Sequence, residues 1–181
     1  MRNDELLIEI LKNQVKPALG CTEPGAVAYA VARAKELLNS QVESLEITVD
    51  KNILKNGMVV GIPGTNEKGI LFAAALSLVV GKSEYQLEVL KDVTEKSIKA
   101  AMEILDSKII RLGLDEEANG LYIKVEAFSN SEKACVVIKN SHSNIVFESK
   151  NGKVLYSYHN AETEQATESN SHSKDIKYMI K

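Results

Sequence analysis

The chain has 181 residues, 44% of them hydrophobic and 26% charged, and this composition and length predict one globular domain with a core of its own. A formal net charge of −3, without a cluster of Lys and Arg, argues against nucleic-acid binding, and no apolar run is long enough to span a membrane. Because there is no leader sequence and Cys21 and Cys135 are too far apart for a disulfide framework, we expect a cytoplasmic protein.

The first predicted elements are two helices. Asn3 or Asp4 can cap the first helix, which Pro17 ends. Its apolar residues recur four positions apart and are expected to face inward: Leu7, Leu11 and Val15. Residues 26–38 are rich in alanine and leucine, so a second, buried helix is expected to run to about Asn39.

The second helix is preceded by a cysteine. Pro24 suits a first helical turn, which makes Glu23 the predicted cap and places Cys21 just upstream. A helix N-terminus favours a thiolate and lowers the pKa of a thiol, as a metal ligand or nucleophile requires. Spacing alone favours the other interpretation, a small buried hydrophobic residue, because no second cysteine is close.

The next segments alternate between extended and helical patterns. Residues 41–50 alternate apolar and polar side chains and predict a half-buried strand. Residues 55–57 predict a turn, and residues 58–62 a short strand or an extended piece. The run 70–80 is apolar on all sides, which predicts a central buried helix ended by Gly81.

The C-terminal half is rich in predicted strands. Residues 86–90 predict a short strand, and Thr94 with Ser97 begins a helix through Leu105. Four more strands are separated by turn residues, among them the hairpin dipeptide Asn151-Gly152: 121–128, 134–138, 144–148 and 154–158. Because such short connections require antiparallel pairing, we predict an α+β fold with helices packed on a mainly antiparallel sheet.

One domain boundary follows from composition. Residues 1–160 form the predicted α+β domain, and residues 161–181 a polar linker and the start of an interrupted helix. Cys135, within an apolar strand, is interpreted as a buried small hydrophobic residue. His142 and Asn144 fall in a predicted hairpin loop, where turn formation alone explains them.

Five segments carry a resemblance to a known family. Residues 15–24 read VKPALGCTEP, and further segments follow in the same order as in that family: 55–58, 62–65, 88–92 and 141–146. From about residue 15 to residue 146 the chain resembles the L-cysteine desulfidase family, relatives of the iron–sulfur L-serine dehydratase alpha chain.

The resemblance implies a carbon–sulfur lyase that converts L-cysteine, or a similar small amino acid, into pyruvate, ammonia and sulfide with a [4Fe-4S] cluster. It implies that Cys21 is a metal ligand of the cluster and that His142 and Asn144 help to hold the substrate carboxylate. Full members continue into a helix-rich catalytic domain with the other cluster cysteines. That domain, or a separate subunit, would supply the catalytic base, so we expect this chain alone to be inactive and without a cluster.

Two alternatives remain open at this point. One is an L-serine dehydratase-type ammonia-lyase, because hydroxyl and thiol leaving groups need a similar shape. The other is a non-catalytic ligand-binding domain or subunit that acts with a separate partner. In either case, apolar faces left exposed would promote self-association.

Overall fold

The computed structural model describes residues 3–14 and 17–158. The helices are α1 (Asn3–Gln14), α2 (Thr22–Leu37), α3 (Lys51–Gly57), α4 (Ile70–Val80), the 3₁₀ helix η1 (Ser83–Glu88) and α5 (Glu95–Asp106). The strands are β1 (Ser44–Val49), β2 (Ile110–Leu114), β3 (Tyr122–Phe128), β4 (Lys133–Lys139), β5 (Ile145–Lys150) and β6 (Lys153–Ser157).

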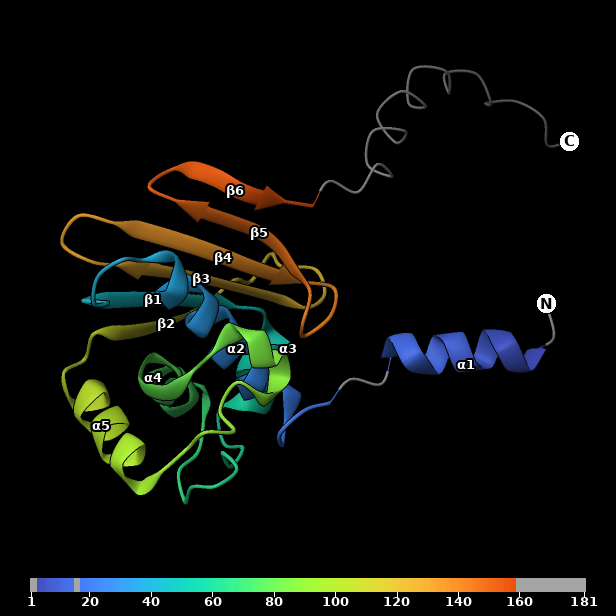
Figure 1. Cartoon of the computed structure of the whole chain (residues 1–181), viewed down its shortest axis with the longest axis horizontal. Coiled ribbons are helices and arrows are strands. Elements are labelled where there is room, and N and C mark those ends of the chain that lie inside the picture. Colours follow the sequence, from blue (N-terminus) through green and yellow to red (C-terminus); the bar gives the residue numbers. More distant parts are fainter. Residues whose placement is uncertain (1–2, 15–16, 159–181) are drawn as a thin grey trace, which may run out of the picture.

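The strands form one sheet in the order β2-β1-β3-β4-β5-β6. The β1–β2 pair is parallel, and the other neighbouring pairs are antiparallel. Helices α2 to α5 lie on one face of this sheet, with α5 outermost (Figure 1). The predicted α+β class, with its strands concentrated in the C-terminal half, is therefore confirmed.

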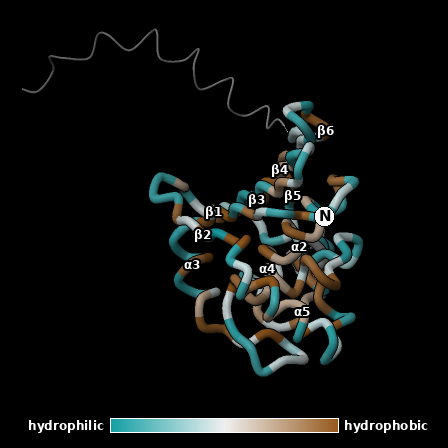
Figure 2. The backbone as a smooth tube through the Cα atoms, turned by 90° about the vertical axis from the view of Figure 1, so that its left-hand side faces the viewer, coloured by the Kyte–Doolittle hydropathy of each residue, from teal (hydrophilic) through white to brown (hydrophobic). Residues whose placement is uncertain are grey.

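The core lies between the sheet and the helices α2 and α4. Apolar stretches of the chain meet there, drawn brown in Figure 2. Alternate residues of the central strands point into the core, which explains why Ile47 of β1 and Val125 of β3 are buried. The alanines of α2 let α4 approach closely, and Ser77 of α4 donates a hydrogen bond of 2.6 Å to the carbonyl oxygen of Ala28.

Asp50 joins the sheet to α3. This buried carboxylate is the N-cap of α3, where Oδ1 accepts hydrogen bonds from the backbone N–H groups of Asn52 (2.7 Å) and Ile53 (3.2 Å). Its other oxygen, Oδ2, accepts from the N–H of Tyr122, at the start of β3 (2.8 Å). One side chain therefore begins a helix and ties that helix to a neighbouring strand.

Several predicted elements agree with the structure. The helices at 26–38, 70–80 and 94–105 correspond to α2, α4 and α5, and Thr94 and Ser97 form the capping box of α5. The first predicted strand is β1, and the four C-terminal ones are β3 to β6. The Asn151-Gly152 hairpin is also confirmed, with positive φ at both residues, as a tight turn between β5 and β6 requires.

Other predictions were wrong. The turn at 55–57 is the last turn of α3. Of the two alternatives for 58–62, the strand does not form in this fully described segment, where Gly61 and Lys68 make an isolated bridge. Residues 86–90 contain the end of η1 instead of a strand. The sequence prediction also missed β2.

The first helix forms, but its apolar stripe does not face inward. Leu7 is 56% exposed and Leu11 is 58% exposed, and α1 lies apart from the helices and the sheet (Figure 1). Val15, the third residue of the stripe, lies outside the described residues, as do the predicted linker and the final helix at 161–181. Of the helices that the structure describes, none is long and apolar enough to cross a membrane.

Candidate functional site

The backbone of the Cys21 loop is fixed by close packing. Cys21 is the N-cap of α2 in an extended conformation, so the helix begins two residues earlier than a Glu23 cap would allow. Gly20 has φ of +77°, and a Cβ atom there would lie 2.4 Å from Cγ of Pro63. Only glycine fits this contact without strain, and the contact holds Cys21 against the loop that contains Pro63.

Glu23 is the central residue of the site. Its Oε2 accepts a hydrogen bond of 2.7 Å from Sγ of Cys21, and its Oε1 accepts one of 3.1 Å from Nδ2 of Asn56, on α3. The hydroxyl of Thr22 also donates to Oε2, at 3.4 Å. The carboxylate therefore links the first turn of α2 to the last turn of α3.

The prediction of an ionised Cys21 thiol is wrong for this arrangement. Burial, together with the hydrogen bond to the Glu23 carboxylate and its negative charge, raises the pKa of Cys21 above its ordinary value. The hydrogen bond from Cys21 lowers the pKa of Glu23, and the Asn56 amide and the charge of His142 act in the same direction. The site thus pairs a protonated thiol with an ionised carboxylate.

The two residues predicted to hold a substrate carboxylate lie on the turn between β4 and β5, but they interact with different parts of the protein. His142 is close enough for its charge to act on Glu23. Asn144 donates from Nδ2 to the carbonyl oxygen of Lys139 (3.0 Å), which closes the turn. Asn144 also lines a separate hollow of about 540 Å³ beside Arg33. Their role as substrate ligands stays a prediction.

Four of the five segments that carry the family resemblance meet around Cys21, and the fifth, residues 141–146, acts on the site through the charge of His142. The cavity beside the thiol has a volume of about 10 Å³. Its walls include Ile62 and Pro63 from the segment 62–65 and Leu90 from the segment 88–92. Asn56 donates a hydrogen bond to Glu23 from the segment 55–58, and the charge of His142 in the segment 141–146 lowers the pKa of Glu23. Because such a volume holds about one water molecule, a ligand would have to bind above this cavity, at the partly exposed Cys21.

A [4Fe-4S] cluster requires more ligands than this site offers, since such clusters are usually held by four cysteine thiolates. Among the described residues no group of three or more His, Cys, Asp or Glu could hold a metal ion. Cys135 is 8% exposed on β4, on the sheet face opposite the helices, and burial raises the pKa of its thiol. Its interpretation as a small buried residue is confirmed, and the described residues do not by themselves fit the cluster.

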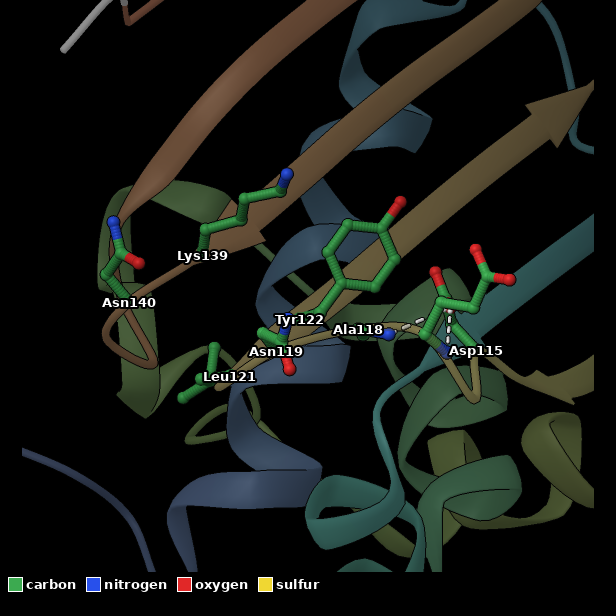
Figure 3. A pocket seen from close by; sticks show the side chains of 8 residues that line it. Asp115, Ala118, Asn119, Leu121, Tyr122, Lys139 and Asn140 are labelled. Atoms are coloured by element: carbon green, nitrogen blue, oxygen red, sulfur yellow. Dashed lines mark hydrogen bonds between the residues drawn. The ribbon is translucent and has the colours of Figure 1, made fainter. Parts of the chain in front are cut away.

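Another hollow, of about 380 Å³, lies where β3 begins and β4 ends. Figure 3 shows Lys139 and Tyr122 side by side on its wall, with the Lys139 ammonium 5.2 Å from the centre of the Tyr122 ring. Oδ1 of Asp115 accepts hydrogen bonds from the N–H groups of Glu117 and Ala118. The Asp115 carboxylate thus stabilises its own turn.

The sequence interpretation missed Asn56, Arg33 and the role of Glu23 as partner of the thiol. Glu23 could have been recognised, because a carboxylate two residues after an N-cap cysteine lies in the same helical turn and competes for the same N–H groups. The contact of Asn56 depends on how α3 packs, and that of Arg33 on β5, so the local pattern carries no signal for either.

Replacing Glu23 with glutamine is expected to lower the pKa of Cys21, because it removes a carboxylate whose hydrogen bond and charge both raise that pKa. The rate of Cys21 alkylation by iodoacetamide near neutral pH should rise severalfold, measured by peptide mapping that separates Cys21 from Cys135. Glu103→Gln removes an exposed carboxylate on α5 and should leave the rate unchanged. A slower reaction in Glu23→Gln would contradict the assigned hydrogen bond.

Comparison with known proteins shows close similarity to longer chains. The chain is 57% identical over 155 residues to a UPF0597 protein of Clostridium tetani, covering 86% of this chain and 37% of that protein. It is 53% identical over 156 residues to a UPF0597 protein of Caldanaerobacter subterraneus, with the same shares covered. A UPF0597 protein of Bacteroides thetaiotaomicron is 43% identical over 150 residues, 82% of this chain and 35% of that protein.

The chain thus spans a little over a third of the length of these relatives. The name UPF0597 protein states no activity. No family model matches the chain, and no solved structure gives a significant match.

Proposed function

We propose that this chain is the N-terminal part of a longer iron–sulfur lyase that converts L-cysteine into pyruvate, ammonia and sulfide, and that Cys21 is one ligand of its [4Fe-4S] cluster. The observation that supports this best is the meeting of four of the five family-like segments around a single, partly exposed thiol. The cytoplasm, where thiols stay reduced, suits this chemistry.

The greater length of the relatives supports the division of the enzyme into two parts. The other cluster ligands and the catalytic base would come from the region that follows, or from a separate subunit. In this proposal the described residues position the Cys21 ligand and accept its proton. Gly20 and Pro63 fix the position of Cys21, and Glu23 is the nearest acceptor for its proton.

The proposal is tested by comparing the 181-residue chain with a protein that includes the following region, both reconstituted with iron and sulfide without oxygen. We expect the longer protein to show stable cluster absorbance and to release sulfide from L-cysteine. The shorter chain should do neither. In the longer protein, Cys21→Ser should lose both properties, whereas Cys135→Ser should keep them, because Cys135 lies on the other face of the sheet.

The same assay separates the remaining alternatives. Faster release of ammonia from L-serine than from L-cysteine would assign the lyase to the dehydratase type. A second candidate, a non-catalytic ligand-binding subunit, is favoured by the ligand-sized hollow beside Arg33. It would replace the lyase proposal if the longer protein held no cluster and released neither product. Sulfide release by the shorter chain alone would refute the division into two parts.

A further inference from the structure

The hollow beside Arg33 is separate from the Cys21 cavity and is assembled from distant parts of the chain. It has a volume of about 540 Å³. Its walls come from α2, η1, the β4–β5 turn, β5 and β6, and include Tyr29, Arg33, Glu84, Gln86, Glu148 and Tyr156. A hollow of this size can take a small metabolite.

Arg33 is held rigidly on the wall of this hollow. Its Nε and Nη2 atoms donate hydrogen bonds of 2.7 and 2.8 Å to the two carboxylate oxygens of Glu148, which is 8% exposed. Its third nitrogen, Nη1, forms a long ion pair of 3.8 Å with Glu36, beyond hydrogen-bond distance. The buried carboxylate fixes one edge of the guanidinium, and the Nη1 edge keeps donors for a second carboxylate.

The other residues that line the hollow could bind a small cation such as an ammonium group. Glu84 is exposed at the rim, and no hydrogen bond or ion pair is assigned to its carboxylate among the described residues. Tyr29 and Tyr156 add aromatic rings, whose faces attract ammonium groups. The hollow thus combines one fixed cation, one available carboxylate and two aromatic rings.

Gln86 gives a second, independent indication that this hollow binds a ligand. Its backbone has φ of 48° and ψ of −118°, a conformation that is costly for a residue with a side chain. Such strain persists where the surrounding structure imposes it, and it is concentrated at ligand sites.

We propose that this hollow binds a free α-amino acid, with its carboxylate on the Nη1 edge of Arg33 and its ammonium group toward Glu84 and the tyrosine rings. This would be a second amino-acid site, apart from Cys21, and it does not depend on the proposed lyase activity. Ser143 and Asn144 line the hollow, and the preceding residue, His142, acts on Glu23.

The test is calorimetric titration of the 181-residue chain with L-alanine and with L-serine, which have no reactive thiol. We expect saturable binding of one equivalent. N-acetyl-L-alanine, which lacks the ammonium group, and L-alaninamide, which lacks the carboxylate, should each bind about tenfold more weakly or not at all. Glu84→Gln should weaken L-alanine binding severalfold, with a circular dichroism spectrum like that of the wild type.

A paired variant tests Arg33 without leaving a buried charge alone. Arg33→Gln with Glu148→Gln removes both partners of the ion pair and should lower the affinity for L-alanine about tenfold or more. Cys21→Ser should bind as the wild type does. The proposal is overturned if no saturable binding is found, if the blocked amino acids bind equally well, or if Glu84→Gln has full affinity. Loss of binding in Cys21→Ser would indicate that the amino acid binds at the Cys21 site. That result would overturn this inference and favour the proposed lyase.

Discussion

Asp50→Ala is expected to lower the free energy of unfolding by about 3 kcal/mol, because three backbone N–H groups lose their acceptor at once. Asp50 is 2% exposed and accepts from Asn52, Ile53 and Tyr122. The N–H of Tyr122 would be left without its side-chain acceptor at the start of β3. Urea denaturation followed by circular dichroism measures the loss.

Asp50→Asn is the matched control for this variant. Its amide oxygen can still cap α3, but its NH₂ group cannot accept from Tyr122, so about half of the loss is expected. An asparagine variant as unstable as the alanine variant would mean that the bond to Tyr122 stabilises the fold and the helix cap does not. A stable alanine variant would contradict the role given to Asp50.

Gly20→Ala is also expected to cost about 3 kcal/mol, from left-handed backbone strain and from overlap with the Pro63 ring. Its φ is +77°, and the new Cβ would lie 2.4 Å from Cγ of Pro63. Relief of this overlap would move the Cys21 loop away from the Pro63 loop. The alkylation rate of Cys21 should therefore change together with the stability.

Gly120→Ala separates the two causes. Gly120 has φ of +82°, and no neighbouring atom lies within 4 Å of the position that a Cβ atom would take there. This variant should show only the backbone cost, about 1 kcal/mol, and an unchanged Cys21 alkylation rate. Equal losses in the two glycine variants would show that the contact with Pro63 adds nothing to stability.

The sequence was most informative where one local cause decides the structure. The residues of α4 are apolar on all sides, so the helix is stable only when it is buried. The capping box of Thr94 and Ser97 defines the start of α5. The strands from β3 to β6 are joined by short turns, so both their existence and their antiparallel pairing could be predicted.

The errors arose where tertiary contacts outweigh local preference. Residues 55–57 resemble a turn because of Asn56-Gly57, but the Asp50 cap and burial of Ile53 continue the helix to Gly57. Residues 86–90 alternate like a strand, yet the positive φ of Gln86 prevents extended pairing. The β2 strand pairs with β1, which lies far earlier in the sequence, and a glycine interrupts its five residues, so the local pattern was weak.

The position of Cys21 before α2 was predictable from Pro24 and the alanine-rich run that follows. Its protonation state was not, because the argument considered the helix N-terminus and left out the Glu23 carboxylate beside the thiol. The hydrogen bond from Asn56 to Glu23, and the effect of the His142 charge on Glu23, depend on packing between α3, the β4–β5 turn and α2.

The place of β1 in the sheet has a consequence for biosynthesis. Both of its partners, β2 and β3, follow it in the chain, and β3 ends at Phe128. While the ribosome is still producing the residues before Phe128, the nascent α2, β1 and α4 have no complete sheet to cover their apolar side chains. Emerging chains of this protein should therefore depend on chaperones until β3 leaves the exit tunnel, and slower translation before that point should increase aggregation.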